Sequence, residues 1–244
     1  MNLDMSIAPA PLLLLKGVHA HYGKSHILHG LDFHLEPNEV VSLLGRNGSG
    51  RSTTMKTIMG LVPVTGGEIL LRDKRISDSR SFQICRAGVA YVPEEREVFA
   101  NLSVDENLRM GEQRAVEGRV QWTVEQMYDY FPRLKDRRNT KGGSLSGGEQ
   151  QMLTICRSLL GNPLLMLIDE PTEGLAPMIV QVVKEVIQDI HRKGVSVVLV
   201  EQKLAIALKV SNRVCVMGHG RIVFEGTPHE LESNPQLMKD WIAL

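Results

Sequence analysis

The chain has 244 residues, with 28 lysines and arginines against 28 aspartates and glutamates, and 43% of its residues are hydrophobic. This neutral composition lacks the basic excess of a dedicated nucleic-acid binder and the high net charge of a disordered protein. The chain is large enough to bury a core without disulfides, and its longest apolar run, at 164–168, is far shorter than the roughly 20 residues of a membrane-spanning helix.

The N-terminal part alternates short apolar blocks with turns and one helical segment. Strands are predicted at 12–22, 28–35, 39–44, 68–72 and 89–92. The apolar period changes at 51–61, which predicts a helix that ends near Pro63.

The segment from about 94 to 148 differs from the flanking parts in its pattern of apolar residues. Amphipathic patterns predict helices at 104–112 and 120–131, and the basic, polar stretch at 133–141 is predicted to be a solvated loop. We therefore expect a helical subdomain inserted into a sheet-based core.

Strands and helices alternate again in the C-terminal part. Strands are predicted at 164–168, 195–200, 214–217 and 221–224, and helices at 149–160, 177–193 and 204–210. This alternation predicts parallel βαβ units and an α/β fold. The chain is expected to form one domain at 12–244 after an N-terminal tail at 1–11.

A glycine-rich loop follows the third predicted strand and opens the first predicted helix. Glycines let backbone N–H groups surround an anion, and the helix N-terminus adds a favourable dipole. The setting of strand, loop and helix favours phosphate binding over a merely structural turn, with the Ser52 hydroxyl placed to bind Mg²⁺. The predicted nucleotide-binding residues of this loop are Gly45, Arg46, Asn47, Gly48, Ser49, Gly50, Arg51, Ser52 and Thr53.

Arg51 departs from the usual pattern of such loops, which have lysine before the Ser or Thr. Lysine brings a compact charge to the β- and γ-phosphates, whereas arginine is longer, planar and prefers bidentate contacts. We therefore assign Arg51 a catalytic and binding role with altered geometry.

Two acids, Asp169 and Glu170, end the apolar strand predicted at 164–168. In nucleotide hydrolases the first such carboxylate holds Mg²⁺ and the second polarises the attacking water. Solvated charges at a strand end are the alternative interpretation. The phosphate loop favours the catalytic one, with Asp169 as metal ligand and Glu170 as catalytic base.

The sequence LSGGE at 145–149 precedes the acids and begins a predicted helix. This sequence resembles the signature motif of the ABC transporter family. Together with the phosphate loop and the strand-end acids, it makes the chain similar to the ATP-binding subunit of an ABC transporter. The resemblance covers nearly the whole chain. It implies a phosphate-loop NTPase core with a mainly parallel central sheet, an N-terminal antiparallel β-subdomain and an inserted α-helical subdomain. It also implies that Ser146, Gly147 and Gly148 bind the γ-phosphate of ATP held by a second subunit.

Three more positions are assigned by this resemblance. Tyr22 matches the aromatic residue that stacks on adenine. Glu94 stands where most members have a glutamine that contacts Mg²⁺ or its water. Gln202 stands where most have a histidine that senses the γ-phosphate, and its amide can donate a hydrogen bond but carries no charge.

The departures point to one subfamily. The sequences YVPE at 91–94, DEPTEGLAP at 169–177 and VEQ at 200–202 are similar to those of ATPases that power uptake of branched-chain amino acids. Importers of urea or short-chain amides, and exporters of lipids, are alternatives because the ATPase does not touch the cargo. A soluble ABC protein of ribosomes or DNA is disfavoured by the single cassette.

The resemblance also implies cofactors, partners and location. The cofactors are ATP and Mg²⁺. The partners are two membrane-spanning permease subunits, a second ATPase subunit that is identical or different, and indirectly a periplasmic solute-binding protein, with no nucleic acid. The chain is expected peripherally at the cytoplasmic face of the bacterial inner membrane. A second hypothesis, based on Arg51, is a subunit that binds ATP but hydrolyses it weakly.

Two groups of residues are not assigned a function. His19, His21, His26, His29 and His34 are expected to be ordinary surface histidines rather than a metal site. The three cysteines, Cys85, Cys156 and Cys215, are expected to be reduced and buried.

Overall fold

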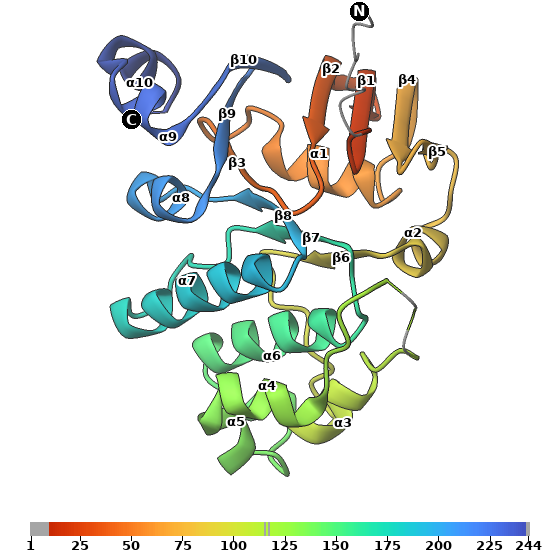
Figure 1. Cartoon of the computed structure of the whole chain (residues 1–244), viewed down its shortest axis with the longest axis vertical. Coiled ribbons are helices and arrows are strands. Elements are labelled where there is room, and N and C mark those ends of the chain that lie inside the picture. The colour runs from red at the N-terminus through yellow and green to blue at the C-terminus, as the bar shows by residue number, and fades with distance from the viewer. Residues whose placement is uncertain (1–9, 115, 117, 243–244) are drawn as a thin grey trace, which may run out of the picture.

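The computed structural model describes residues 10–114, 116 and 118–242. Most of the predicted tail at 1–11 therefore lies outside the described residues. Two sheets form the upper and middle parts of the molecule and a group of helices forms the lower part (Figure 1). No helix in the described ranges has the length and apolar character needed to cross a bilayer.

The first sheet is antiparallel and has the strand order β2-β1-β4-β5. Its strands are β1 (Leu13–Tyr22), β2 (Ser25–Leu35), β4 (Val64–Leu71) and β5 (Lys74–Arg75). Buried and more exposed residues alternate along β1 because successive side chains point to opposite faces. One face of this sheet therefore packs on the core.

The second sheet has the order β10-β9-β3-β8-β7-β6, with every neighbouring pair parallel except β10 and β9. Its strands are β3 (Val40–Leu44), β6 (Val89–Val92), β7 (Leu165–Asp169), β8 (Ser196–Val200), β9 (Arg213–Gly218) and β10 (Arg221–Gly226). All residues of β3, β7 and β8 are buried, as expected for central parallel strands covered on both faces.

The helices cover this second sheet on both sides. Along β7, Leu165 and Leu167 join the core under the first sheet, whereas Met166 and Ile168 join the core that contains the lower helices. The helices are α1 (Arg51–Ile58), α2 (Ser81–Ala87), α3 (Val104–Arg109), α4 (Val124–Tyr130), α5 (Pro132–Asp136), α6 (Gly147–Leu159), α7 (Pro177–Arg192), α8 (Leu204–Val210), α9 (Pro228–Glu232) and α10 (Pro235–Trp241). A 3₁₀ turn spans Gly142–Ser144.

Most predicted elements are confirmed to within a few residues, but four short helices were missed or misread. The basic stretch predicted as a loop contains α5, and α2, α9 and α10 were not predicted. Each of α2, α5 and α9 buries one residue and α10 buries none, so they show almost no apolar periodicity. Caps define their starts instead: Pro132 is the first residue of α5, and a capping box joins Thr227 and Glu230 in α9.

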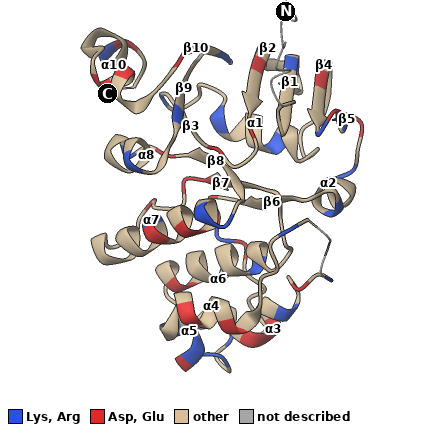
Figure 2. Cartoon of the chain, in the orientation of Figure 1, with Lys and Arg blue, Asp and Glu red and all other residues tan. Residues whose placement is uncertain are grey.

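The parallel topology decides where the functional residues meet. Because β3, β7 and β8 run in the same direction, their carboxyl ends lie at one edge of the sheet. The glycine-rich loop follows β3, Asp169 ends β7, and Gln202 follows β8. Basic and acidic residues both occur throughout the sheets and the helices (Figure 2).

Candidate functional site

The glycine-rich loop has a backbone that requires glycine at defined points. Gly45, Gly48 and Gly50 have φ angles of 144°, 81° and 106°. A Cβ on Gly45 would lie 2.5 Å from the Met217 carbonyl oxygen and 2.8 Å from the Ser49 hydroxyl. The loop therefore needs glycine at Gly45 for lack of space and at all three positions for their positive φ, and a loop of this kind can present backbone N–H groups to an anion.

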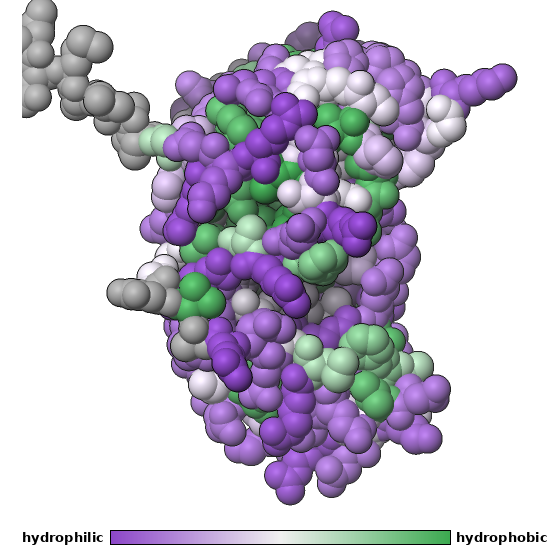
Figure 3. All heavy atoms as spheres, turned by 90° about the vertical axis from the view of Figure 1, so that its right-hand side faces the viewer, coloured by the Kyte–Doolittle hydropathy of each residue, from purple (hydrophilic) through white to green (hydrophobic). Residues whose placement is uncertain are grey.

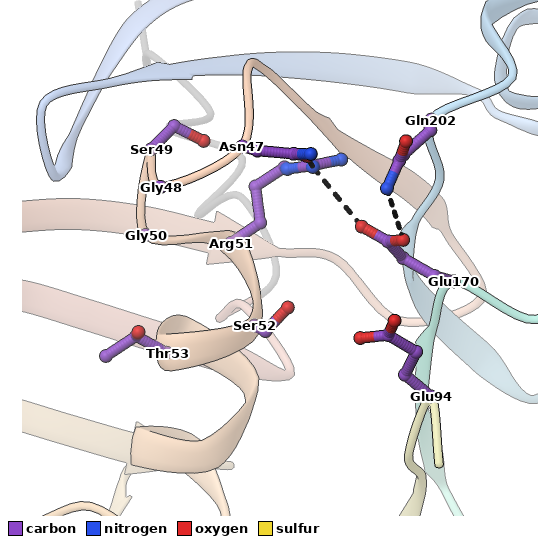
Figure 4. Close-up of a pocket in the computed structure, with 10 residues that line it drawn as sticks. All are labelled: Asn47, Gly48, Ser49, Gly50, Arg51, Ser52, Thr53, Glu94, Glu170 and Gln202. Atoms are coloured by element: carbon purple, nitrogen blue, oxygen red, sulfur yellow. Dashed lines mark hydrogen bonds and ion pairs between the residues drawn. The ribbon is translucent and has the colours of Figure 1, made fainter. Parts of the chain in front are cut away.

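A cavity of about 270 Å³ opens in front of this loop. Figure 4 shows the loop and the start of α1 on one side, and Glu94, Glu170 and Gln202 on the other. The ten lining residues all belong to the predicted site: Asn47, Gly48, Ser49, Gly50, Arg51, Ser52, Thr53, Glu94, Glu170 and Gln202. Segments that are far apart in the sequence thus meet around one cavity.

Ser52 and Asp169 form the part of the site that fits Mg²⁺. The Ser52 hydroxyl donates to Oδ1 of Asp169 at 3.1 Å, and the Tyr91 hydroxyl donates to Oδ2 at 3.3 Å. Both Ser52 and Asp169 offer hard oxygen ligands, and Mg²⁺ typically takes one or two carboxylates together with phosphates and waters. A small protein ligand set therefore fits, and the described residues contain no larger metal-binding group of His, Cys, Asp and Glu.

The protonation of Asp169 reflects its surroundings. Burial raises the pKa of Asp169 to about 6, and the negative charges of Glu170 and Glu94 act in the same direction, whereas hydrogen bonds from Ser52 and Tyr91 lower it. Without a cation, this carboxylate is therefore costly to ionise. A bound divalent cation at this point would favour its charged form.

Arg51 points at Glu170 rather than into open space. Its Nη2 lies 3.2 Å from Oε1 of Glu170, and the side chains are only 5% and 7% exposed. The same guanidinium donates to Oδ1 of Asn47 at 3.2 Å and to the Glu201 carbonyl at 3.5 Å. The cation predicted to bind phosphate is thus paired with the predicted catalytic base.

Gln202 binds the other oxygen of Glu170. Its Nε2 donates to Oε2 at 2.5 Å, so both carboxylate oxygens of Glu170 have partners (Figure 4). Glu170 also has a φ of 45°, a left-handed conformation that is unfavourable for a residue with a side chain. Backbone strain of this kind is frequent where a functional side chain must be aimed.

Glu94 completes the acidic side of the cavity. It follows β6, is exposed, and its carboxylate points toward Ser52 in Figure 4. Although Glu94 is exposed, the protein atoms around its carboxyl reduce its solvation and raise its pKa, and the nearby charges of Glu170, Glu95 and Glu173 raise it further. Like Asp169, it would ionise more readily beside a cation.

Several predicted residues lie outside this cavity. Tyr22 ends β1 and is 48% exposed. Arg46 lines a separate cavity with Trp241 of α10, and its Nη2 donates to the Lys239 carbonyl at 3.1 Å. Gly45 supports the loop from behind, against Met217.

The signature residues also lie apart from the cavity, at the start of α6. Ser146 is the N-cap of this helix in a capping box: its hydroxyl accepts from the Glu149 N–H, and the Glu149 carboxylate accepts from the Ser146 N–H at 2.8 Å. Ser146 is exposed, and Gly147 and Gly148 are partly exposed. Their role toward the nucleotide of another subunit therefore remains a prediction.

Sequence reasoning missed two residues of this region. Tyr91 contacts Asp169, and buried Glu201 contacts the loop that follows Glu170. Burial and the Asp169 charge raise the pKa of Tyr91. A charged residue directly after the apolar run Val197–Val200 was the available signal for Glu201.

The five N-terminal histidines are partly exposed, and four of them, His19, His21, His26 and His29, lie beside one another. Nδ1 of His19 and Nε2 of His26 are 3.0 Å apart, and the His21 and His26 rings stack with centroids 4.0 Å apart. Burial lowers the pKa of His21, and His26 adds to the effect. Among the cysteines, Cys156 and Cys215 are buried as predicted, whereas Cys85 is exposed.

Comparison with known proteins agrees with this geometry. Residues 28–173 match the family model described as ABC transporter. The chain is 40% identical to the high-affinity branched-chain amino acid transport ATP-binding protein BraG of Pseudomonas aeruginosa, over 95% of this chain and all of that protein. It is 30% identical to the lipopolysaccharide export system ATP-binding protein LptB of Escherichia coli, over 95% of this chain and 97% of that protein.

A solved structure of an ATP-binding cassette of an ABC transporter, in its ADP conformation, shows the same fold. The TM-score is 0.80 at 23% identity, with 94% of this chain and 98% of that chain covered. The predicted fold class and the family resemblance are both confirmed. The chain therefore belongs to the ABC transporter family, as one of its ATP-binding subunits.

Proposed function

We propose that the chain is the ATP-hydrolysing subunit of an importer of branched-chain amino acids. The observation that carries this proposal is the 40% identity to BraG along the whole length of that protein. LptB, at 30% identity, makes lipopolysaccharide export the second candidate. The fold and the phosphate-binding cavity are compatible with both cargoes because the cargo does not enter this subunit.

The phosphates of ATP are held by the loop at 45–52 and the N-terminus of α1. Backbone N–H groups and the helix dipole attract the phosphate oxygens. Ser52 and Asp169, with Glu94 beside them, would hold Mg²⁺, which neutralises phosphate charge when bound. Tyr22, exposed at the end of β1, supplies a flat aromatic surface for the adenine ring.

Glu170 acts as the base that accepts a proton from the attacking water. In the structure its oxygens bind Arg51 and Gln202, so it is aimed into the cavity but neutralised by the arginine. Phosphate competes with Glu170 for the guanidinium, and transfer of Arg51 to the phosphate frees the carboxylate. Gln202 continues to donate to the other oxygen of Glu170 and so holds the carboxylate in place.

Transport requires partners that this chain does not contain. A second ATPase subunit supplies Ser146, Gly147 and Gly148 to the γ-phosphate, and two permease subunits form the membrane path. On the face with α2 (Figure 3), apolar areas interrupt a mostly hydrophilic surface. Phe82 in α2 and Met110 after α3 are exposed and suit contact with permease subunits at the cytoplasmic face of the membrane.

Reconstitution tests this function directly. The chain is combined, in proteoliposomes with ATP and Mg²⁺, with any permeases, second ATPase subunit and solute-binding protein whose genes lie next to its own. We expect ATP-dependent uptake of labelled leucine, isoleucine or valine, and loss of uptake with Glu170→Gln. ATP-dependent transport of urea, a short-chain amide or lipopolysaccharide, without branched-chain amino acid uptake, would assign a different cargo.

A further inference from the structure

Glu201 is a buried acid that lies between two parts of the site without lining the cavity. It follows β8 directly and is 2% exposed. Its Oε2 accepts from the Thr172 hydroxyl at 2.7 Å, and its Oε1 accepts from the backbone N–H groups of Gln202 and Lys203 at 2.9 Å each. Every hydrogen bond of this carboxylate therefore goes to the β8 loop or to the loop after Glu170.

These contacts continue the connection between β7 and β8 beyond the end of their backbone ladder. The last backbone bond is from the Glu170 N–H to the Val200 carbonyl, at 2.9 Å. Past that point the two loops are joined through side chains. Thr172 donates its hydroxyl to Glu201, and its carbonyl accepts from Nζ of Lys203 at 3.0 Å.

The loops joined in this way carry the two residues that face the cavity. Gln202, next to Glu201, donates to Glu170, which lies two residues before Thr172. Glu170 has a left-handed backbone, a conformation that persists only where surrounding contacts hold it. The hydrogen bond between Glu201 and Thr172 therefore joins the two loops on the side of Gln202 and Glu170 away from the cavity.

Burying the carboxylate of Glu201 costs free energy, so its presence in the interior needs a reason. Burial of an acid is strongly opposed without partners, and an apolar side chain would pack there more favourably. Charge-assisted hydrogen bonds are short and directional, so three of them on one carboxylate fix the relative positions of the groups that donate. The carboxylate of Glu201 is therefore explained by the positions that its hydrogen bonds fix.

We propose that Glu201 is a positioning residue for ATP hydrolysis, because its buried carboxylate fastens the Gln202 loop to the loop that carries Glu170. This inference rests on the proposed ATPase function. Glu201 does not line the nucleotide cavity, so its loss misplaces Gln202, and through Gln202 also Glu170, without removing a contact to ATP. The effect falls on kcat and spares KM.

The test removes the hydrogen bond between Glu201 and Thr172 in two ways and restores it in one. Thr172→Val deletes the donor at nearly constant volume, Glu201→Asp shortens the carboxylate, and Thr172→Ser keeps a hydroxyl. In steady-state ATPase assays of the reconstituted transporter, we expect kcat to fall about tenfold for the first two variants, with KM for ATP within about twofold. Thr172→Ser should recover most of the turnover.

A double-mutant cycle separates positioning from general destabilisation. If Glu201 acts through Gln202, adding Thr172→Val or Glu201→Asp to Gln202→Ala lowers kcat by less than about twofold more. Glu39→Gln, which alters another largely buried carboxylate at the opposite end of β3, lowers thermal stability but not kcat.

The outcomes distinguish a failure of the proposed ATPase function from a failure of the positioning role of Glu201. A reconstituted wild-type transporter without ATP hydrolysis would overturn the proposed function and this inference with it. Normal wild-type hydrolysis with unchanged kcat in both variants, or a full further loss on top of Gln202→Ala, would overturn only the role of Glu201. If Thr172→Val does not fold, Glu201→Asp decides the matter alone.

Discussion

Arg51 and Glu170 form a buried ion pair, with Nη2 of the arginine 3.2 Å from Oε1 of the glutamate. Arg51 begins α1 directly after the phosphate loop, and Glu170 directly follows β7. The pair therefore joins the residue that should hold phosphate to the residue that should activate water. ATP must compete with Glu170 for the same guanidinium.

Arg51→Lys should raise ATP turnover several-fold, both for the chain alone and in the assembled complex. The compact ammonium of lysine makes one contact where the guanidinium also binds Asn47 and the Glu201 carbonyl, so it is released to phosphate more readily. Steady-state phosphate release measures the effect. Lys56→Arg, the reverse change farther along α1, is the matched control, and an unchanged rate in Arg51→Lys would show that the arginine does not limit turnover.

Glu170→Gln should lower kcat by about 10²–10⁴ because the amide cannot accept the proton of the attacking water. ATP binding should persist, since the phosphate loop is intact and Arg51 loses its competing carboxylate. A fluorescent nucleotide titration and a phosphate-release assay report the two properties separately. Glu173→Gln, an exposed neighbour, controls for the loss of charge. Hydrolysis retained in Glu170→Gln would assign the base to another residue.

Asp169→Asn should raise the Mg²⁺ concentration needed for half-maximal hydrolysis by about tenfold or more, because a charged oxygen ligand is replaced by a neutral amide. The measurement is an ATPase titration with Mg²⁺ at saturating ATP. The control is Asp78→Asn, which changes an exposed acid distant in sequence from Asp169 and should leave the Mg²⁺ titration unchanged. An unaltered Mg²⁺ requirement in Asp169→Asn would remove this residue from the metal site.

Tyr22→Ala should weaken ATP binding about tenfold through the loss of base stacking, whereas Tyr22→Phe should keep it. The ring is exposed at the end of β1, so truncation leaves the core intact. Nucleotide affinity by calorimetry, with melting temperature as a check on folding, distinguishes the variants. Equal affinity for wild type and Tyr22→Ala would place adenine elsewhere.

The lowered pKa of Glu39 should make the free energy of unfolding decrease at acidic pH. Burial raises the pKa of Glu39, but hydrogen bonds from Arg213 and from the Glu36 N–H bring it below the ordinary value of 4.5. The folded protein therefore binds this proton less readily than the unfolded chain. The stabilisation is present above pH 4.5 and is lost as the pH falls through the lowered folded pKa.

Urea unfolding at several pH values checks this dependence. The free energy of unfolding of wild type should fall below about pH 4.5, and Glu39→Gln should be less stable at neutral pH and show a smaller slope. The pair with Arg213, at 2.8 Å, is the source of the difference. Identical slopes in both proteins would show that Glu39 titrates normally.

Much of the site could be predicted from the sequence because its parts are local motifs. The phosphate loop is a strand, a glycine turn and a helix start within one short segment, and Asp169 and Glu170 end one apolar strand. The four short helices could not be predicted in this way. They bury at most one residue each, so caps and neighbouring packing define them rather than an apolar period.

The sequence by itself determined the family, the α/β fold and the list of groups at the carboxyl edge of the sheet, because strand periodicity and glycine-rich turns are written in neighbouring residues. Only the tertiary structure decided how those groups pair. Arg51 binds Glu170, Gln202 binds the same carboxylate, and Glu201 binds Thr172. Each pair joins segments distant in sequence, so it depends on the parallel register of β3, β8 and β7 and on side-chain reach across their ends.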